Sequence, residues 1–429
     1  MIGVPRRRGG GALGQKAGGG RVLLLANNFP PVRGGSASVY ANLARCAAGR
    51  VAVLAASSDY TDGLPLIGWR EHDRGAPYPV MRLPLLRTTL GLRRRDPRKL
   101  LWAAWDVMIR LRLTAALAAL ILRGGVRTVC VGELLAGGWV LRLLRWVPGV
   151  RTVAYVHGEE ITIGDPHDRP HRRARRALRD SDRVVVVSSF TRDAVVALMG
   201  PGAAGQVVLI QNGVDTGHFQ PSPKSPELLR LYGLEGCFVY VSVSRLVEKK
   251  GTDTAIRAFA QVLARHPDCR LLVVGSGPYR EVLDRIARDA SVAESVVFAG
   301  AVADDDLVAH YQLGDVFVMP NRRMPDGDTE GFGLVFLEAN ACGLPAIAGR
   351  DGGSTEAVED GVNGLVVDGH SVDAVAAAML ALREDAGLYA RLRRQGLAVA
   401  AASDWRVRTG VFLEVCGEGQ GPGSSSAAL

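Results

Sequence analysis

Short apolar runs alternate with helical patterns along most of the chain. In the first half, each run is only a few residues long and rich in β-branched side chains, which is typical of strands that are buried on both faces of a sheet. The runs assigned as strands are residues 21–26, 51–55, 80–83, 128–131, 152–156, 183–188 and 207–210. Helical patterns such as residues 36–48 and 190–199 separate them. This half therefore predicts a parallel sheet covered by helices.

The alternation stops after Phe219, at residues 220–226, a segment that contains three prolines. Such composition favours a semi-rigid linker. Beyond it, strand-like runs resume at residues 238–244, 271–274, 296–299, 316–319, 345–348 and 365–367. The chain therefore predicts two doubly wound, Rossmann-like α/β domains that face a central cleft. Ligands of such sheets bind at the carboxyl ends of the strands.

The domain boundaries follow from these runs. Residues 21–219 are predicted to form the first domain, 220–226 the linker and 227–402 the second domain. Residues 403–416 are expected to form a C-terminal helix that crosses back to the first domain. Residues 1–20 are basic and glycine-rich but lack the apolar stretch of a signal peptide, so we expect a disordered tail there. Residues 417–429 are expected to be a second tail.

Composition narrows the class of protein. Hydrophobic residues make up 48% and charged residues 22% of the chain, which excludes a largely disordered protein and a polytopic membrane protein. The six cysteines form no C-x-x-C pair, which argues against a structural zinc site and fits a reducing cytosol. We therefore expect a cytoplasmic protein.

The two halves of the chain carry opposite charge. Residues 1–199 contain 32 Lys and Arg against 14 Asp and Glu, whereas residues 200–429 contain 20 against 29. A basic half favours an anionic partner, such as membrane phospholipid, a phosphorylated substrate or nucleic acid. Drift in an arginine-rich proteome explains the same imbalance, because the chain has 47 Arg and only 5 Lys.

The most apolar stretch is residues 100–122. Its longest uncharged run, residues 113–122, falls far short of the ~20 residues needed to cross a bilayer. The cluster Arg93–Arg95, Arg98 and Lys99 precedes this stretch, and Trp102 and Trp105 lie within it. Together they favour an interfacial helix that docks on the anionic inner face of the cytoplasmic membrane. The alternative is an ordinary helix packed on the sheet with a solvated basic end.

A first candidate anion site follows the first strand. Gly34 and Gly35 open the next helix, and the free backbone N–H groups and partial positive charge of a helix start suit an anion. The spacing is not that of the dinucleotide-binding G-x-G-x-x-G pattern.

A second candidate ends the first strand of the second domain, in Ser244-Arg-Leu-Val-Glu-Lys-Lys-Gly251. Arg245 can bind two phosphate oxygens at once and Lys250 acts as a point charge, so this turn suits a diphosphate. The alternative is a solvated basic turn.

The third candidate is Glu330-Gly-Phe-Gly-Leu-Val-Phe-Leu-Glu338. We expect a helix to start near Gly331, with Glu330 at its N-terminal edge and Glu338 about two turns along it. The free N–H groups of Gly331, Phe332, Gly333 and Leu334 would form another anion site. A capping glutamate followed by a surface glutamate is the alternative.

These motifs, in this order, resemble the retaining glycosyltransferases of family 4, which have the GT-B fold. Further matches are Asn212-Gly-Val-Asp215, Val274-Gly-Ser-Gly-Pro278, Cys342-Gly-Leu-Pro345, Gly352-Gly-Ser-Thr-Glu356 and Asn363-Gly364. The resemblance covers roughly residues 20–415 and is closer in the second domain. Residues 320–330 are particularly similar to bacterial mannosyltransferases that act on phosphatidylinositol mannosides.

The resemblance implies roles for individual residues. Arg245 and Lys250 would bind the donor diphosphate, and His157, in Tyr155-Val-His-Gly158, would face the transferred sugar. Glu338 would hold the ribose hydroxyls, and Glu330 the sugar. The remaining donor-binding positions are Gly34, Gly35, Gly275, Gly277, Gly331, Phe332, Gly333 and Leu334. The second domain would bind the nucleotide-sugar and the first domain the acceptor.

The implied activity is a retaining transfer of a hexose from a nucleotide-sugar, with GDP-mannose as the first candidate, to a lipid-linked or otherwise anionic acceptor. The resemblance implies no metal and no other cofactor, and Asp304-Asp-Asp306 is expected to start a helix, since acidic residues favour a helix N-terminus. The alternative is a transferase that uses UDP-glucose or UDP-N-acetylglucosamine on a soluble secondary metabolite or antibiotic precursor.

Three other classes are less well supported. The Glu330–Glu338 spacing counts against a sugar-nucleotide epimerase, and a phosphorylase would need a phosphate or cofactor site that the sequence does not show. A non-catalytic nucleic-acid or lipid-binding protein remains as a remote alternative. We expect no nucleic-acid partner, because the arginines fall mostly on helices and loops rather than on aromatic-interleaved strands.

Overall fold

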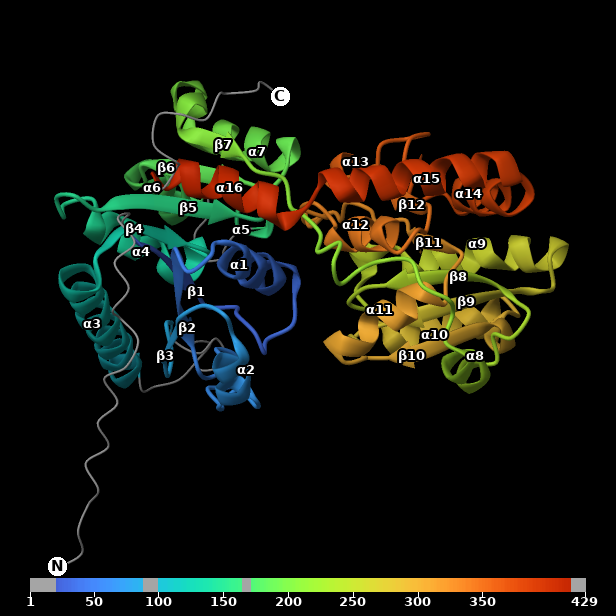
Figure 1. Ribbon diagram of the computed structural model, residues 1–429, viewed down its shortest axis with the longest axis horizontal. Helices are drawn as coiled ribbons and strands as arrows, with labels where there is room; N and C mark the ends of the chain where they lie inside the picture. The colour runs from blue at the N-terminus through green and yellow to red at the C-terminus, as the bar shows by residue number, and fades with distance from the viewer. Residues whose placement is uncertain (1–20, 88–98, 164–170, 418–429) are drawn as a thin grey trace, which may run out of the picture.

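The computed structural model describes residues 21–87, 99–163 and 171–417. They form two parallel sheets, one of seven strands in the order β3-β2-β1-β4-β5-β6-β7 and one of six in the order β10-β9-β8-β11-β12-β13. Helices cover both faces of each sheet, and the two domains lie side by side (Figure 1). The predicted fold class is confirmed.

Each apolar run predicted as a strand is a strand in the structure, with ends that differ by at most two residues. The strands of the first sheet are β1 (Arg21–Ala26), β2 (Val51–Ala56), β3 (Val80–Leu83), β4 (Val126–Val131), β5 (Arg151–Val156), β6 (Arg183–Val186) and β7 (Val207–Leu209). Those of the second are β8 (Phe238–Val243), β9 (Cys269–Val274), β10 (Val296–Gly300), β11 (Val316–Met319), β12 (Ala346–Gly349) and β13 (Gly364–Val367).

The first sheet is buried on both faces, as successive strand residues point to opposite sides. In β1, Val22 and Leu24 face one core while Leu23 and Leu25 face another. The helices of this domain are α1 (Gly35–Cys46), α2 (Trp69–Gly75), α3 (Lys99–Gly124), α4 (Leu134–Leu144), α5 (Glu159–Thr162), α6 (Arg172–Asp180) and α7 (Ser189–Met199). Helix α1 packs on the first of these cores, and α3, α4, α6 and α7 pack on the second.

The second sheet is covered in the same way. Its helices are α8 (Pro226–Tyr232), α9 (Thr252–Arg265), α10 (Arg280–Asp289), α11 (Asp304–Gln312), α12 (Leu334–Ala341), α13 (Ser354–Ala357), α14 (Val372–Glu384) and α15 (Ala386–Ala402). Helices α9, α10 and α14 cover one face, and α11 and α12 cover the other. Helix α11 begins at Asp304, as expected for the acidic run at its start.

The last helix, α16 (Trp405–Val415), returns to the first domain and lies over its sheet beside α1 (Figure 1). Its Phe412 is fully buried with its ring centroid 6.1 Å from that of Tyr155. The hydroxyl of Thr128 on β4 donates to the carbonyl of Cys416 at 2.8 Å. One buried hydrophobic cluster runs from the first sheet through Trp405 into the second domain, so the two domains share a core at the hinge.

Helix α3 lies at the outer edge of the first domain (Figure 1). Within the described residues, none of the helices is long and apolar enough to cross a membrane. The predicted basic cluster at Arg93–Arg95 and Arg98 lies outside the described residues. Trp105 is exposed, whereas Trp102 is half-buried with its indole nitrogen covered, so Trp105 presents the larger aromatic surface to solvent.

Replacing Phe412 by Ala is expected to destabilise the protein by about 3–5 kcal/mol, because it removes a fully buried aromatic ring from the shared core. Urea unfolding measures the change. Val407→Ala, on the exposed side of the same helix, is the matched control and should change stability by no more than about 0.5 kcal/mol. Equal effects of the two changes would show that α16 is not part of the core.

Candidate active site

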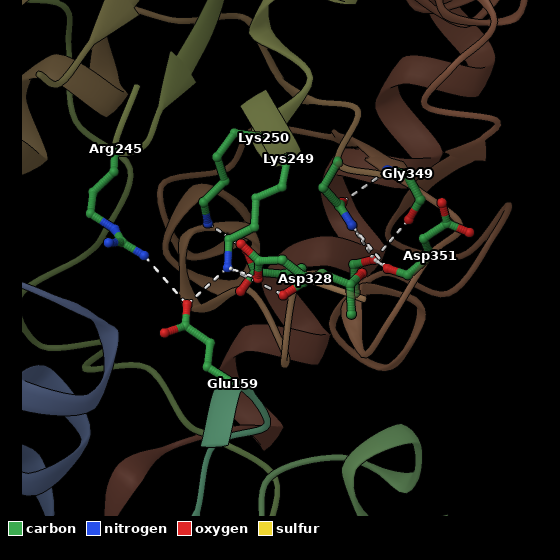
Figure 2. Close-up of polar contacts among 11 residues, drawn as sticks. Glu159, Arg245, Lys249, Lys250, Asp328, Gly349 and Asp351 are labelled. Carbon is green, nitrogen blue, oxygen red and sulfur yellow. Dashed lines mark hydrogen bonds and ion pairs between the residues drawn. The ribbon is translucent and has the colours of Figure 1, made fainter. Parts of the chain in front are cut away.

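The candidate site lies where the carboxyl ends of the two sheets face each other. From the second domain come the turn after β8, which carries Arg245, Lys249 and Lys250, and the loop after β11, which carries Asp328 and Glu330. The first domain contributes the segment after β5 and the glycine pair after β1. Figure 2 shows the charged groups of this region pointing toward one another.

Lys250 and Glu330 form an ion pair, and both side chains are largely buried. Burial opposes a charge on Glu330, but the Lys250 ammonium more than offsets this and holds the pKa of the carboxyl below its usual value. Glu330 is therefore an anion that accepts hydrogen bonds. The structure brings together two residues that the sequence analysis assigned to different parts of the donor.

Lys249 forms the centre of a second group of charges (Figure 2). Its ammonium contacts Asp328 at 2.6 Å and Glu159 of the first domain at 2.8 Å. The same oxygen of Glu159 lies 3.5 Å from the guanidinium of Arg245. Sequence analysis did not single out Lys249, Asp328 or Glu159. Lys249 lies inside the quoted basic turn, but the pairing with Glu159 joins residues that are 90 positions apart.

Glycines let the backbone pack closely behind the charged groups. A Cβ on Gly275 would overlap the carbonyl of Ser244, and one on Gly277 would overlap that of Leu246. Both glycines therefore support the turn that presents Arg245. In the same way, Gly352 and Gly353 lack a side chain where they meet the backbone of residues 330–331. The buried amide of Asn321 ties this loop to its neighbours, because it donates to the Asp351 carbonyl at 2.9 Å.

The expected helix start near Gly331 is wrong, because α12 begins at Leu334. Gly333 has a φ of 88°, a left-handed conformation that glycine adopts without strain. Gly331 packs against the first domain, where a Cβ would overlap the carbonyl oxygen of His157. Residues 331–333 therefore form a loop, and backbone contacts across the cleft decide its path. Phe332 is buried.

Glu338 lies in the second turn of α12, about one turn nearer the helix start than the sequence analysis expected, because the helix begins at Leu334. Its carboxylate accepts a hydrogen bond from the hydroxyl of Tyr311 at 2.7 Å. Burial raises the pKa of Glu338 to about 7. The residue lines a cavity at the hinge between the domains, with Ser38, Asn42 and Trp405 among the other walls.

His157 follows β5, and its Nε2 lies 2.8 Å from the hydroxyl of Tyr40. The single proton of that hydroxyl is donated to the carbonyl of Gly132, so Nε2 of the histidine must carry a proton and donate it to Tyr40. Burial lowers the pKa of His157 to about 4. The ring is therefore neutral near pH 7, and its other nitrogen, Nδ1, is the hydrogen-bond acceptor.

Gly34 and Gly35 stand at the start of α1, opposite α12 of the second domain. Side-chain atoms of Leu334 lie 3.9 Å from where a Cβ of Gly35 would be. Beside them, the guanidinium of Arg33 donates to the carbonyl of Val302 at 2.7 Å and lies 3.4 Å from Asp304. The glycine pair therefore borders the same cleft as residues 330–334.

Among the described residues there is no group of three or more His, Cys, Asp or Glu side chains that could hold a metal ion. The sequence does contain Asp326-Gly-Asp328, an Asp-x-Asp pattern that the sequence analysis did not weigh. Asp328 is paired with Lys249, and Asp326 accepts from the backbone N–H of Asp328 at 3.0 Å. These contacts order the loop that carries Glu330.

Comparison with known proteins identifies the class. Residues 233–398 match the family of glycosyl transferases group 1, and residues 33–218 match glycosyltransferase family 4. The chain belongs to these glycosyltransferases and is a glycosyltransferase with the GT-B fold.

Particular relatives are also similar over most of their length. The GDP-mannose-dependent alpha-(1-6)-phosphatidylinositol monomannoside mannosyltransferase of Mycolicibacterium smegmatis is 38% identical over 368 residues, covering 83% of this chain and 88% of the relative. The corresponding Mycobacterium tuberculosis protein is 36% identical over 85% and 89% of the two chains. Among solved structures, Anabaena HepE in complex with UDP and glucose has a TM-score of 0.71 at 20% identity, over 92% of this chain and 98% of that one; this likeness concerns the fold.

Gly331→Ala is expected to lower the rate of sugar transfer by about 100-fold, because the new Cβ would push the loop carrying Glu330 away from His157. Steady-state kinetics measures the loss, and circular dichroism checks that the variant is folded. Gly410→Ala, on α16 with no atom within 4 Å of the added carbon, is the control. Unchanged kinetics in Gly331→Ala would mean that the two domains do not approach here during turnover.

Glu338 predicts a pH dependence of stability. Its folded pKa of about 7 lies above its ordinary value of 4.5, so the stability linked to its proton is complete below pH 4.5 and is lost as the pH rises through 7. Glu338→Gln has no such proton. The melting temperature of the wild type relative to Glu338→Gln should therefore fall between pH 5 and pH 8. Two parallel curves across this range would contradict the raised pKa.

Proposed function

We propose that the protein is a retaining mannosyltransferase that moves mannose from GDP-mannose to a lipid-linked acceptor of the phosphatidylinositol-mannoside type. The observation that carries the proposal is the group of three cations after β8, Arg245, Lys249 and Lys250, which lies beside Glu159 of the first domain. The donor and acceptor come from the relatives, two of which share 36–38% of their residues with this chain and carry this activity in their names.

In this proposal, the cations bind the donor diphosphate and stabilise the negative charge that develops as it leaves. Glu330 accepts hydrogen bonds from hydroxyls of the sugar, and the backbone N–H groups of residues 331–334 donate to oxygens of the bound donor. The neutral His157 offers the lone pair of Nδ1 to a sugar hydroxyl and adds no charge beside the oxocarbenium-like transition state. The acceptor hydroxyl attacks from the leaving-group face and its proton passes to the departing phosphate. No step requires a metal.

The first domain presents an apolar surface that fits a membrane. Along α3, the exposed side chains include Leu101, Trp105, Leu111 and Leu122, and Trp146 after α4 is exposed as well. Helix α6, which covers the same face of the sheet, exposes Arg172, Arg175 and Arg176. Exposed leucine and tryptophan beside arginine are typical of contacts with anionic lipid. We propose that these helices dock the enzyme on the membrane that holds its acceptor.

Hydrolysis of the donor tests the first proposal. Purified enzyme is expected to cleave GDP-mannose slowly without acceptor and to prefer it over UDP-glucose and UDP-N-acetylglucosamine, also in excess EDTA. Arg245→Ala, Lys250→Ala and Glu330→Gln should each lower turnover by about 100-fold or more, because each removes charge stabilisation or positioning of the donor. Preference for a UDP-sugar would show that GDP-mannose is not the donor. Loss of activity on chelation, restored by Mn²⁺, would show that the reaction needs a metal ion.

Co-sedimentation with vesicles tests the membrane contact. Binding is expected to require phosphatidylinositol or another anionic lipid, to weaken with salt, and to fall when Trp105 and Leu111 become Ser. Leu231→Ser is the matched control, because Leu231 is 70% exposed in the second domain and Leu111 is 65% exposed. Retention of the wild type in the supernatant at low salt would exclude membrane docking and direct the search to soluble acceptors.

A further inference from the structure

The three cations of the cleft are each paired with a carboxylate. Lys250 pairs with Glu330, and Lys249 pairs with Asp328, all within the second domain. Glu159 is the carboxylate from the first domain, and it contacts both Lys249 and Arg245 (Figure 2). The three cations thus face three carboxylates. A donor diphosphate would therefore add negative charge to a site that is already neutral, unless one carboxylate leaves.

Only one of these carboxylates is placed to leave easily. Glu159 sits on the short helix α5 with 55% of its side chain exposed, whereas Asp328 and Glu330 are 24% and 14% exposed. Rotation of its side chain into solvent needs no change of the backbone. Lys249, by contrast, is 6% exposed and is also held by Asp328 and by the carbonyl of Thr329 at 3.4 Å. The lysine therefore stays in place when Glu159 moves.

A carboxylate oxygen and a phosphate oxygen are equivalent acceptors for an ammonium or guanidinium donor. The oxygen of Glu159 that lies 2.8 Å from Lys249 and 3.5 Å from Arg245 occupies a position where a bridging phosphate oxygen would make the same contacts. Burial opposes the charged form of Lys249, but Glu159 and Asp328 more than compensate and keep its pKa above the usual value. An anion in that place therefore stabilises the ammonium in addition to Asp328, whether it is the carboxylate or a phosphate.

We propose that Lys249 is a further ligand of the donor diphosphate, and that Glu159 holds its place until the donor arrives and is then exchanged for it. The inference rests on the proposed function and extends it to residues for which the sequence motifs gave no role. Asp328 positions the ammonium throughout the exchange. Because Glu159 belongs to the first domain and the cations to the second, the exchange replaces an ion pair between the domains by contacts with the donor.

A simpler role for Glu159 would be to hold the domains together. Glu356 provides the comparison, since it also links the domains but through neutral groups. It lies on α13 and accepts from the backbone N–H of Ser189 at 2.5 Å and from the side-chain amide of Gln211 at 3.0 Å. A variant at Glu356 loses contacts between the domains and leaves the three cations as they are.

Calorimetric titration with GDP separates these roles. Glu159→Gln is expected to bind GDP about fivefold more tightly than the wild type, because it removes an anion that competes for Lys249 and Arg245. The gain is modest because Glu159 and Arg245 are exposed to solvent. Glu356→Gln should not bind GDP more tightly. Lys249→Met should bind GDP about tenfold more weakly, and adding Glu159→Gln to it should bring back little of the affinity, because the main partner of Glu159 is gone.

Unchanged or weaker binding of GDP by Glu159→Gln would overturn the exchange, as would equal tightening by Glu356→Gln or full affinity in Lys249→Met. A melting curve for each variant checks that it is folded. Because Glu159 is largely exposed, its replacement by Gln should leave the fold intact. The same titrations with UDP identify the base. If UDP binds in place of GDP with the same ranking of variants, the exchange holds and the proposed donor is wrong. If neither nucleotide binds, both proposals fail.

Discussion

Three positive charges at the end of a single strand have to be neutralised, and the arrangement of the cleft follows from that constraint. Arg245, Lys249 and Lys250 all follow β8. Arg245 is exposed, but both lysines are largely buried, and burying a charge is costly unless it is paired. The second domain supplies two of the partners and the first domain supplies one. The same ion pairs therefore connect the two domains and neutralise the cations of the candidate anion site.

Sequence alone predicts the strands well, because a strand that is buried on both faces must be apolar at every position, and that signal is local. It also predicts Arg245, Lys250 and Glu330 as site residues, because they belong to motifs with fixed spacing. The start of α12 is harder to predict. A sequence Glu-Gly-Phe-Gly before an apolar run is compatible with a helix from Gly331, and only packing against His157 and residues 352–353 shows why the chain stays in a loop until Leu334.

Glu159 and Asp328 could not be recognised for a related reason. Both carboxylates contact the Lys249 ammonium, which lies between them. The spacing of these residues along the chain does not predict that contact. Lys249 is adjacent to a residue that was assigned a role, yet its own side chain points to different partners from those of Lys250. Similarly, the tautomer of His157 depends on Tyr40 and Gly132, which come from separate elements. Contacts of this kind form only in the folded chain, between residues that are far apart in sequence.

Helix α16 gives the second domain an unusual place in the chain. The polypeptide leaves the first domain after β7, builds the second sheet, and comes back at Asp404, where Val214 pairs with it. In topological terms the second domain is an insertion into the first, attached by two neighbouring crossings of the chain. Two such attachments permit the second domain to bend toward the first about the line that joins the two crossings. They resist rotation of one domain against the other about the long axis of the molecule. They also mark the two junctions at which the second domain could be exchanged for that of another family member, while the first domain keeps both of its ends.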